Sequence, residues 1–139
     1  QHRIIRLDPK THAATVFAAT GKAGFSGDGG PADQAQLNIP MCGVIDPSGK
    51  SMVIADLVNQ RVRRIDLTTK VITTIAGNGQ KGLPKDGDDA LAAPVGDARA
   101  ACVARDGTLY VLLRGGNALA AVKDGKVQVA ASSAPSPSS

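Results

Sequence analysis

The sequence predicts an all-β fold assembled from a repeated unit of short strands. The chain matches itself after a shift of 58 residues, which indicates a repeat architecture. Its apolar residues come in short runs separated by Gly, Pro, Asn and Asp, the residue types that form turns. No long segment has helical periodicity, and the one helical turn that we predict covers 32–37, directly after Pro31.

The internal repeat is the strongest of these signals. It aligns 3–35 with 61–93 without a gap and gives twelve identities in 33 positions, where chance would give about two or three. The identical pairs are Arg3/Arg61, Arg6/Arg64, Asp8/Asp66, Thr11/Thr69, Thr15/Thr73, Ala18/Ala76, Gly21/Gly79, Gly24/Gly82, Asp28/Asp86, Gly29/Gly87, Ala32/Ala90 and Ala35/Ala93. Residues 58 apart are therefore expected to occupy the same place in successive units.

Each complete unit is predicted to hold four strands. In the best-preserved unit they cover 43–45, 52–55, 61–65 and 71–76. A weaker copy over 101–131 has the same order of strands and turns, and the N-terminal segment supplies the third and fourth strands of an earlier copy. Four short antiparallel strands in each unit is the pattern of a β-propeller blade.

The domain organisation follows from these units. We predict the C-terminal half of one blade with an inter-blade loop over 1–40, a complete blade with its loop over 41–98, a degenerate third blade over 99–131, and a disordered Ser/Pro-rich tail over 132–139. These two and a half blades cannot close a ring, which usually takes about four to eight. We expect the remaining blades to come from a longer chain, with oligomerisation as the alternative.

Composition argues against several classes of function. The chain has no Trp, one Tyr and two Phe, so nucleic acid bases would find few aromatic partners despite the net charge of +4. No apolar run reaches the roughly 18–20 residues of a membrane span. Cys42 and Cys102 lack metal-ligand spacing and are predicted to be small buried hydrophobes.

Several stretches resemble the bacterial type of the NHL-repeat family. Residues 24–32 (GFSGDGGPA) and 35–40 (AQLNIP) resemble its inter-blade segment, 54–66 (IADLVNQRVRRID) its repeat core, and 72–79 (ITTIAGNG) its closing outer strand. The resemblance covers 3–129 and implies a six-bladed parent propeller that mainly binds proteins, nucleic acid or other ligands. It also favours a bacterial, periplasmic or secreted setting. The third blade departs from the pattern, with Leu113 at the position of the core Asp and Asn117 matched to Asn59.

Five polar residues are the candidates for a ligand-binding face. They are Asp56, Asn59, Arg61, Arg3 and Arg63. The favoured interpretation is structural, with Asn59 holding a turn and Asp56 pairing with Arg61, because a repeated polar motif usually serves the repeat itself. The alternative is a polar ligand face at one end of the ring.

A basic strip for an anionic partner is a related hypothesis. Equivalent strands of adjacent blades lie side by side, so their arginines would line up. The members of this strip would be Arg3, Arg6, Arg61, Arg63 and Arg64. The competing interpretation is that these side chains are solvated or paired with Asp8 and Asp66.

No catalytic, cofactor or metal site is predicted. The chain has two histidines, His2 and His12, and offers no Ser-His-Asp or Cys-His set. The acidic loop 86–89 lacks the spacing of a calcium loop, and the glycine-rich segments lack a phosphate-binding pattern. We therefore predict a non-catalytic binding or scaffold module that recognises a protein or small ligand. The alternative is part of a metal-dependent lactonase or lyase whose catalytic residues lie elsewhere.

Overall fold

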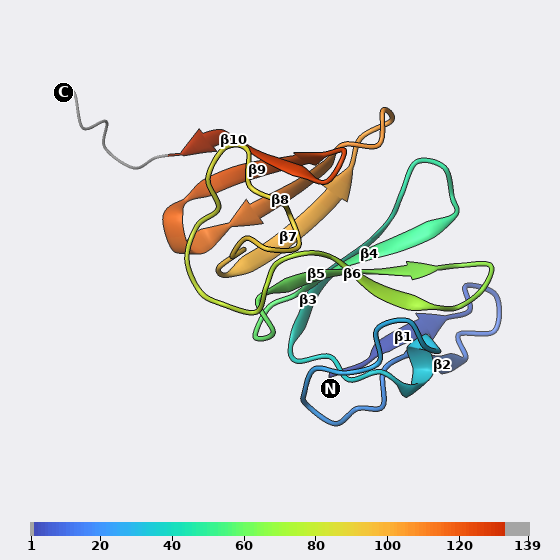
Figure 1. Cartoon of the computed structure of the whole chain (residues 1–139). Helices are drawn as coiled ribbons and strands as arrows, with labels where there is room; N and C mark the ends of the chain where they lie inside the picture. The colour runs from blue at the N-terminus through green and yellow to red at the C-terminus, as the bar shows by residue number, and fades with distance from the viewer. Residues whose placement is uncertain (1, 133–139) are drawn as a thin grey trace, which may run out of the picture.

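Ten strands in three antiparallel sheets make up the computed structural model, which describes residues 2–132 (Figure 1). The first blade holds β1 (Ile4–Leu7) and β2 (Ala14–Ala18), and the second holds β3 (Pro40–Ile45), β4 (Ser51–Asp56), β5 (Arg61–Asp66) and β6 (Ile72–Ala76). The third holds β7 (Ala98–Val103), β8 (Leu109–Leu113), β9 (Ala118–Lys123) and β10 (Lys126–Ser132). Strands that neighbour each other in a sheet also neighbour each other in the sequence, so each blade is a meander. The predicted all-β, blade-like fold is confirmed.

Two differences concern the ends of predicted elements. The helical turn after Pro31 is shorter than predicted, because only Ala32–Gln34 form a 3-10 turn (η1) and Ala35 is already extended. A second such turn (η2, Arg114–Gly116) lies between β8 and β9. The predicted tail lies outside the described residues, apart from Ser132, which ends β10.

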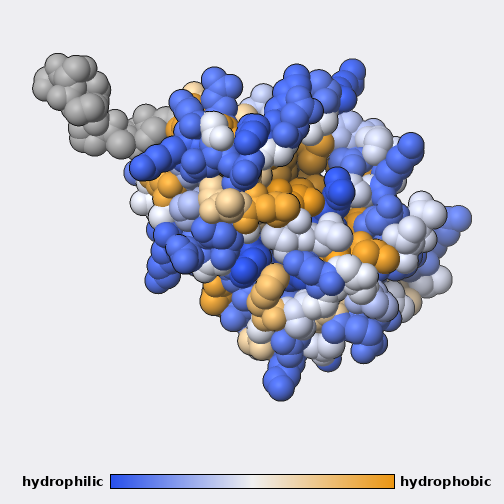
Figure 2. All heavy atoms as spheres, in the orientation of Figure 1, coloured by the Kyte–Doolittle hydropathy of each residue, from blue (hydrophilic) through white to orange (hydrophobic). Residues whose placement is uncertain are grey.

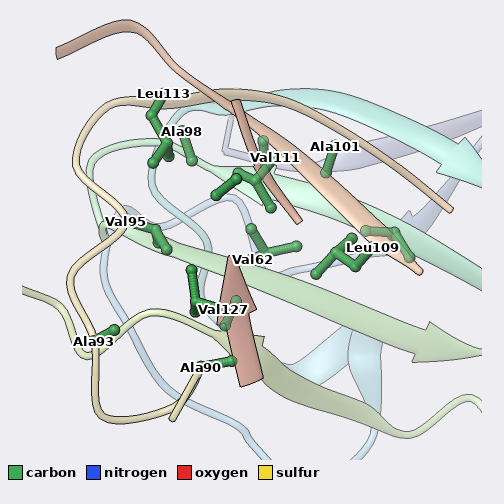
Figure 3. Packing of buried hydrophobic residues seen from close by; sticks show 14 of the residues in the cluster. Val62, Ala90, Ala93, Val95, Ala98, Ala101, Leu109, Val111, Leu113 and Val127 are labelled. Carbon is green, nitrogen blue, oxygen red and sulfur yellow. The ribbon is translucent and has the colours of Figure 1, made fainter. Parts of the chain in front are cut away.

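Apolar side chains fill the spaces between successive sheets. The cluster between the second and third blades includes Val62, Val111 and Leu113, all fully buried (Figure 3). Alanine occupies many of the remaining buried positions, among them Ala98 and Ala101 on β7. Small side chains allow the sheets to approach closely, but each buries little area, so many must contribute to the core.

The repeat holds at the level of single contacts. The Arg3 guanidinium donates to the Thr20 carbonyl at 2.9 Å, and the Arg61 guanidinium donates to the Asn78 carbonyl at 3.3 Å. Both residues of the first pair are 58 positions before those of the second. The prediction that residues one repeat apart occupy the same place is confirmed for these pairs.

The two inter-blade segments, 19–39 and 77–97, each pair with the outermost strand of the following blade. Pro31 forms an isolated β-bridge with Val71, next to β6, and Asp89 forms one with Lys126 of β10. Since β6 and β10 are the last strands of their sheets, these bridges cover strand edges that the meander itself leaves open.

The prediction that both cysteines are buried is wrong. Cys42 is half-buried and Cys102 is exposed. Cys102 follows the buried Ala101 on β7, and side chains alternate between the two faces of a strand. Its side chain therefore points away from the second blade, to the face of the third blade that has no sheet against it.

Three aspartates in turns have lowered pKa values, and these make the stability of the fold depend on pH. Asp8, Asp66 and Asp106 each use Oδ1 to accept backbone N–H groups in a turn, the first two from Thr11 and Thr69 among others, and Asp106 from Thr108. These hydrogen bonds hold the pKa of each carboxyl below its ordinary value.

We expect the chain to lose stability as the pH falls below about 4. Unfolded carboxylates take up protons at the ordinary aspartate value, whereas the folded turns favour the ionised form. This stabilisation is therefore present above the ordinary pKa and is lost as pH falls through the lower folded values. Denaturant titrations from pH 7 to pH 2 would measure it. Asn keeps the accepting Oδ1 but does not titrate, so replacing Asp8, Asp66 and Asp106 together by Asn should reduce the loss. Part of it should remain, because hydrogen bonds from the Ser48 and Ser51 hydroxyls also lower the pKa of Asp46. An unchanged profile would contradict the assignment.

Candidate functional site

Asp56 is the last residue of β4 and its side chain is fully buried. Its Oδ1 accepts the backbone N–H of Asn38 at 2.8 Å, and its Oδ2 accepts the Asn59 amide at 2.8 Å and the Arg63 guanidinium at 3.2 Å. These partners come from the inter-blade segment 19–39, the β4–β5 turn and β5 respectively. One carboxylate thus holds together three parts of the chain.

Burial raises the pKa of Asp56 above its ordinary value. The N–H of Asn38, the amide of Asn59 and the guanidinium of Arg63 act in the opposite direction, because each stabilises the ionised form. The carboxylate and guanidinium form a fully buried ion pair. Such a pair needs further hydrogen bonds to offset the loss of hydration, and Asp56 has them.

Arg63, on β5, is also fully buried and uses all of its donors. Nε and Nη2 donate to Asp28 Oδ1 at 3.2 and 3.0 Å, and Nη2 also donates to the Ser26 carbonyl at 3.0 Å. Nη1 donates to the Gln36 carbonyl and to Asp56 Oδ2, both at 3.2 Å. A guanidinium has five N–H groups, so none is left for a ligand. Arg63 therefore belongs to the framework.

Asp28, which sequence reasoning did not connect with Arg63, completes this network. Its Oδ1 takes the Arg63 ion pair at 3.0 Å, and its Oδ2 accepts the Thr74 hydroxyl of β6 at 2.6 Å. The carboxylate thereby fastens the inter-blade segment to the third and fourth strands of the second blade. We call Asp28, Asp56, Asn59 and Arg63 the polar latch.

The predicted pairing of Asp56 with Arg61 is wrong. The Arg61 guanidinium donates to the carbonyls of Asn59 and Asn78 and lies over the ring of Phe25, 3.8 Å from its centroid. Asp56 and Arg61 do oppose each other across the β4–β5 pair. The side chain of Arg61 nevertheless contacts both inter-blade segments, through Phe25 and Asn78, and Arg63 pairs with the Asp56 carboxylate.

Asn59 holds its turn, as predicted, and reaches further. Its amide donates to Asp56 Oδ2 and to the Gly24 carbonyl, both at 2.8 Å. Arg3 is exposed and donates to the Thr20 carbonyl of the inter-blade segment 19–39. The predicted basic strip is not continuous, because Arg63 is turned into the interior whereas Arg64, the next residue, is exposed.

The third blade replaces the polar latch with apolar residues. In strand pairing, Leu113 and Ala118 oppose each other as Asp56 and Arg61 do, so Ala120 takes the place of Arg63. Leu113 and Ala120 are both buried. The buried Asp56–Arg63 ion pair is thus replaced by an apolar pair, and Asp86, one repeat after Asp28, accepts the N–H of Val129 in place of a guanidinium.

The match of Asn117 to Asn59 is wrong by one residue. Asn117 has a left-handed backbone with φ 47°, as does Gln60 with φ 54°, and each directly precedes its strand. Gly116 therefore stands at the position of Asn59. A Cβ at residue 116 would lie 2.3 Å from Leu83 Cδ1, so Leu83 fills the space where the Asn59 side chain lies in the second blade.

The acidic loop 86–89 is also occupied by internal contacts. Asp86 accepts the N–H of Val129 at 2.6 Å, Asp88 accepts that of Lys85 at 2.9 Å, and Asp89 pairs with Lys126 at 2.5 Å. Within residues 2–132, no three His, Cys, Asp or Glu side chains are grouped so that they could hold a metal ion.

Comparisons with known proteins support the fold more than any activity. No family model matches the sequence. The curated protein SUPPRESSOR OF QUENCHING 1, chloroplastic, from Arabidopsis thaliana is 41% identical over 66 residues, which is 48% of this chain and 6% of that protein.

Two crystal structures from Bacteroides thetaiotaomicron share the arrangement of the blades. One is of a structural genomics protein of unknown function, with a TM-score of 0.68 and 17% identity. The other is of an auxiliary nutrient binding protein, with a TM-score of 0.62 and 16% identity. Each match covers 92% of this chain but 30% of the other chain, so this chain spans less than a third of either neighbour. At such identity the likeness shows the fold alone.

Proposed function

We propose that this chain is a section of an NHL-type β-propeller that serves as a non-catalytic recognition module for a protein or small ligand. The polar latch carries the proposal. The repeat's buried polar side chains are engaged in holding an inter-blade segment to a blade, so they act as a scaffold. The ligand would then be bound by turns and by clefts between blades, where residues can change without disturbing that scaffold.

The description of one fold neighbour as an auxiliary nutrient binding protein agrees with a ligand-binding role. A thermal-shift screen of the full chain with small metabolites, combined with metal analysis and a lactone-hydrolysis assay, tests the proposal. We expect saturable binding without turnover. Hydrolysis that depends on a stoichiometric divalent metal and is abolished by a chelator would overturn it in favour of the enzyme alternative.

We further propose that additional blades of a longer chain cover the two ends of the stack. The outer face of the first blade exposes Ile5, Leu7 and Val16, each by about half (51%, 60% and 49%), and the outer face of the third exposes Leu112. Exposed apolar faces of sheets mark places where another layer packs. Both fold neighbours extend well beyond the region they share with this chain.

Light scattering distinguishes the source of these blades. If a longer chain supplies them, the 139-residue chain should form no oligomer of fixed size and should bind a dye specific for apolar surface. A discrete oligomer with its apolar faces covered would overturn the proposal in favour of assembly from several copies.

Within residues 2–132, no helix has the length and apolar character needed to cross a membrane.

A further inference from the structure

A cleft of about 290 Å³ lies between the second and third blades. It opens where the β3–β4, β7–β8 and β9–β10 turns approach one another, and apolar surface is visible where the two larger sheets meet (Figure 2). Its walls include apolar side chains from five strands, namely Val53, Ile75, Val103, Leu109 and Val122. The interior of the cleft is therefore suited to an aliphatic group.

Three charged residues also line this cleft: Arg64 from β5, Asp46 from the β3–β4 turn, and Asp124 from the β9–β10 turn. Arg64 and Asp124 are exposed. The ion pairs found among the described residues do not include either of them. Asp46 accepts hydrogen bonds from the hydroxyls of Ser48 and Ser51. The positive charge of Arg64 helps to lower the pKa of the Asp66 carboxyl, but no ion pair joins Arg64 to Asp46 or Asp124. Opposite charges thus line one cavity without being paired with each other.

The cleft between the first and second blades provides an internal comparison. It has a volume of about 340 Å³ and is lined by Arg6 and Phe17, which are 58 residues before Arg64 and Ile75. Leu67, the first residue after β5, stands where Asp124 follows β9. The arginine is thus present in both clefts, whereas the carboxylate after the third strand is present in one.

We propose that the cleft between the second and third blades binds a small zwitterion with an apolar body, of the class of free aliphatic α-amino acids. The ligand's carboxylate would pair with Arg64, whose planar guanidinium suits two parallel hydrogen bonds. The ammonium would pair with Asp124 and Asp46, and the aliphatic side chain would lie on the apolar walls. The volume is at the lower end of small-molecule pockets, about 300–1,000 Å³, as a ligand of this size requires. The inference rests on the proposed recognition function and names a ligand class for it.

The test uses calorimetric titration of the full chain with L-leucine and two analogues. The first, 4-methylpentanoate, lacks the ammonium, and the second, 3-methylbutylamine, lacks the carboxylate. Arg64→Gln should weaken leucine binding by roughly tenfold or more, since hydrogen bonds to charged groups contribute about 1.5–3 kcal/mol, and should leave the amine's affinity unchanged. Asp124→Asn should weaken leucine similarly and leave the acid's affinity unchanged.

Both variants are expected to fold. Arg64 is exposed, and Asp124 and Gly125 form a two-residue hairpin turn with φ 52° and 76°, in which Asn-Gly is as favourable as Asp-Gly. Arg6→Gln in the other cleft is the matched control and should leave leucine binding unchanged.

Two results would overturn the site while leaving the recognition function standing. One is saturable leucine binding that neither Arg64→Gln nor Asp124→Asn weakens. The other is failure of leucine to bind a chain for which the metabolite screen finds a different ligand. Metal-dependent turnover in the earlier assay would instead overturn the recognition function itself.

Discussion

Replacing Arg63 by Ala is expected to lower the free energy of unfolding by about 3–5 kcal/mol, the range measured when one partner of a buried ion pair is removed. The substitution leaves the fully buried Asp56 without its ion-pair partner. It also removes the donor that the carbonyls of Ser26 and Gln36 use. Urea denaturation measures the loss. Arg64→Ala is the matched control on the same strand, and because Arg64 is exposed it should change stability by no more than about 0.5 kcal/mol.

The third blade supplies the sequence of a compensated variant. Asp56→Leu combined with Arg63→Ala installs the pair found at Leu113 and Ala120, which are both buried. The double variant leaves neither Asp56 nor Arg63 as an unpaired charge in the interior. Its free energy of unfolding should therefore fall by about 1–3 kcal/mol less than the sum of the decreases caused by the two single substitutions. Strict additivity, or an Arg63→Ala loss no larger than that of Arg64→Ala, would contradict the role given to the polar latch.

Gly77→Ala is expected to destabilise the chain by about 2–5 kcal/mol. Gly77 has a left-handed backbone with φ 98°, and its added Cβ would lie 2.5 Å from the Gln60 carbonyl oxygen and 2.6 Å from Val95 Cγ2. The left-handed backbone costs a non-glycine residue about 1–2 kcal/mol, and overpacking adds typically about 1–3 kcal/mol. One of the two nearest atoms belongs to the backbone, so rotation of a side chain cannot relieve the clash.

Gly49→Ala separates these two contributions. Gly49 also has a positive φ, 74°, but a Cβ there would have no neighbour within 4 Å. Gly49→Ala should therefore lower the free energy of unfolding only by the cost of the left-handed backbone, about 1–2 kcal/mol. Ala19, one repeat before Gly77, keeps φ 71°, which shows that the fold accepts this backbone in Ala. Equal losses for the two variants, measured by thermal unfolding with the same probe, would contradict the crowding at Gly77.

The sequence predicted the strands and their order well because those features depend on local residues. The turns around Asp46 and Asp66 contain residues that favour turns wherever they occur. The repeat then carried the assignment from the second blade to the weaker third. A one-residue error remained at Gly116 and Asn117, because the two asparagines were matched by residue type although the β4–β5 and β8–β9 turns have equal length.

The polar latch was only partly predicted: Asp56, Asn59 and Arg63 lie on one hairpin, but Asp28 is far from them in the chain. Arg63 and Asp28 are separated by 35 residues, and no local spacing marks them as neighbours. The run from Arg61 to Arg64 places charged residues on both faces of β5, so alternation alone does not show which arginine is buried. Joint replacement of Asp56 and Arg63 in the third blade was a usable signal, but the offset at Asn117 concealed it. The exposure of Cys102 depended on which face of its sheet another blade covers.

The bridges between inter-blade segments and outermost strands also bear on self-association. An open strand edge presents free N–H and C=O groups to which another molecule can add a strand, which is a route to fibril formation. At β6 and β10 the chain's own segments occupy part of that edge through Val71 and Lys126. The outer edges of the second and third blades are thus partly shielded from intermolecular strand addition by the same connections that lead from one blade to the next.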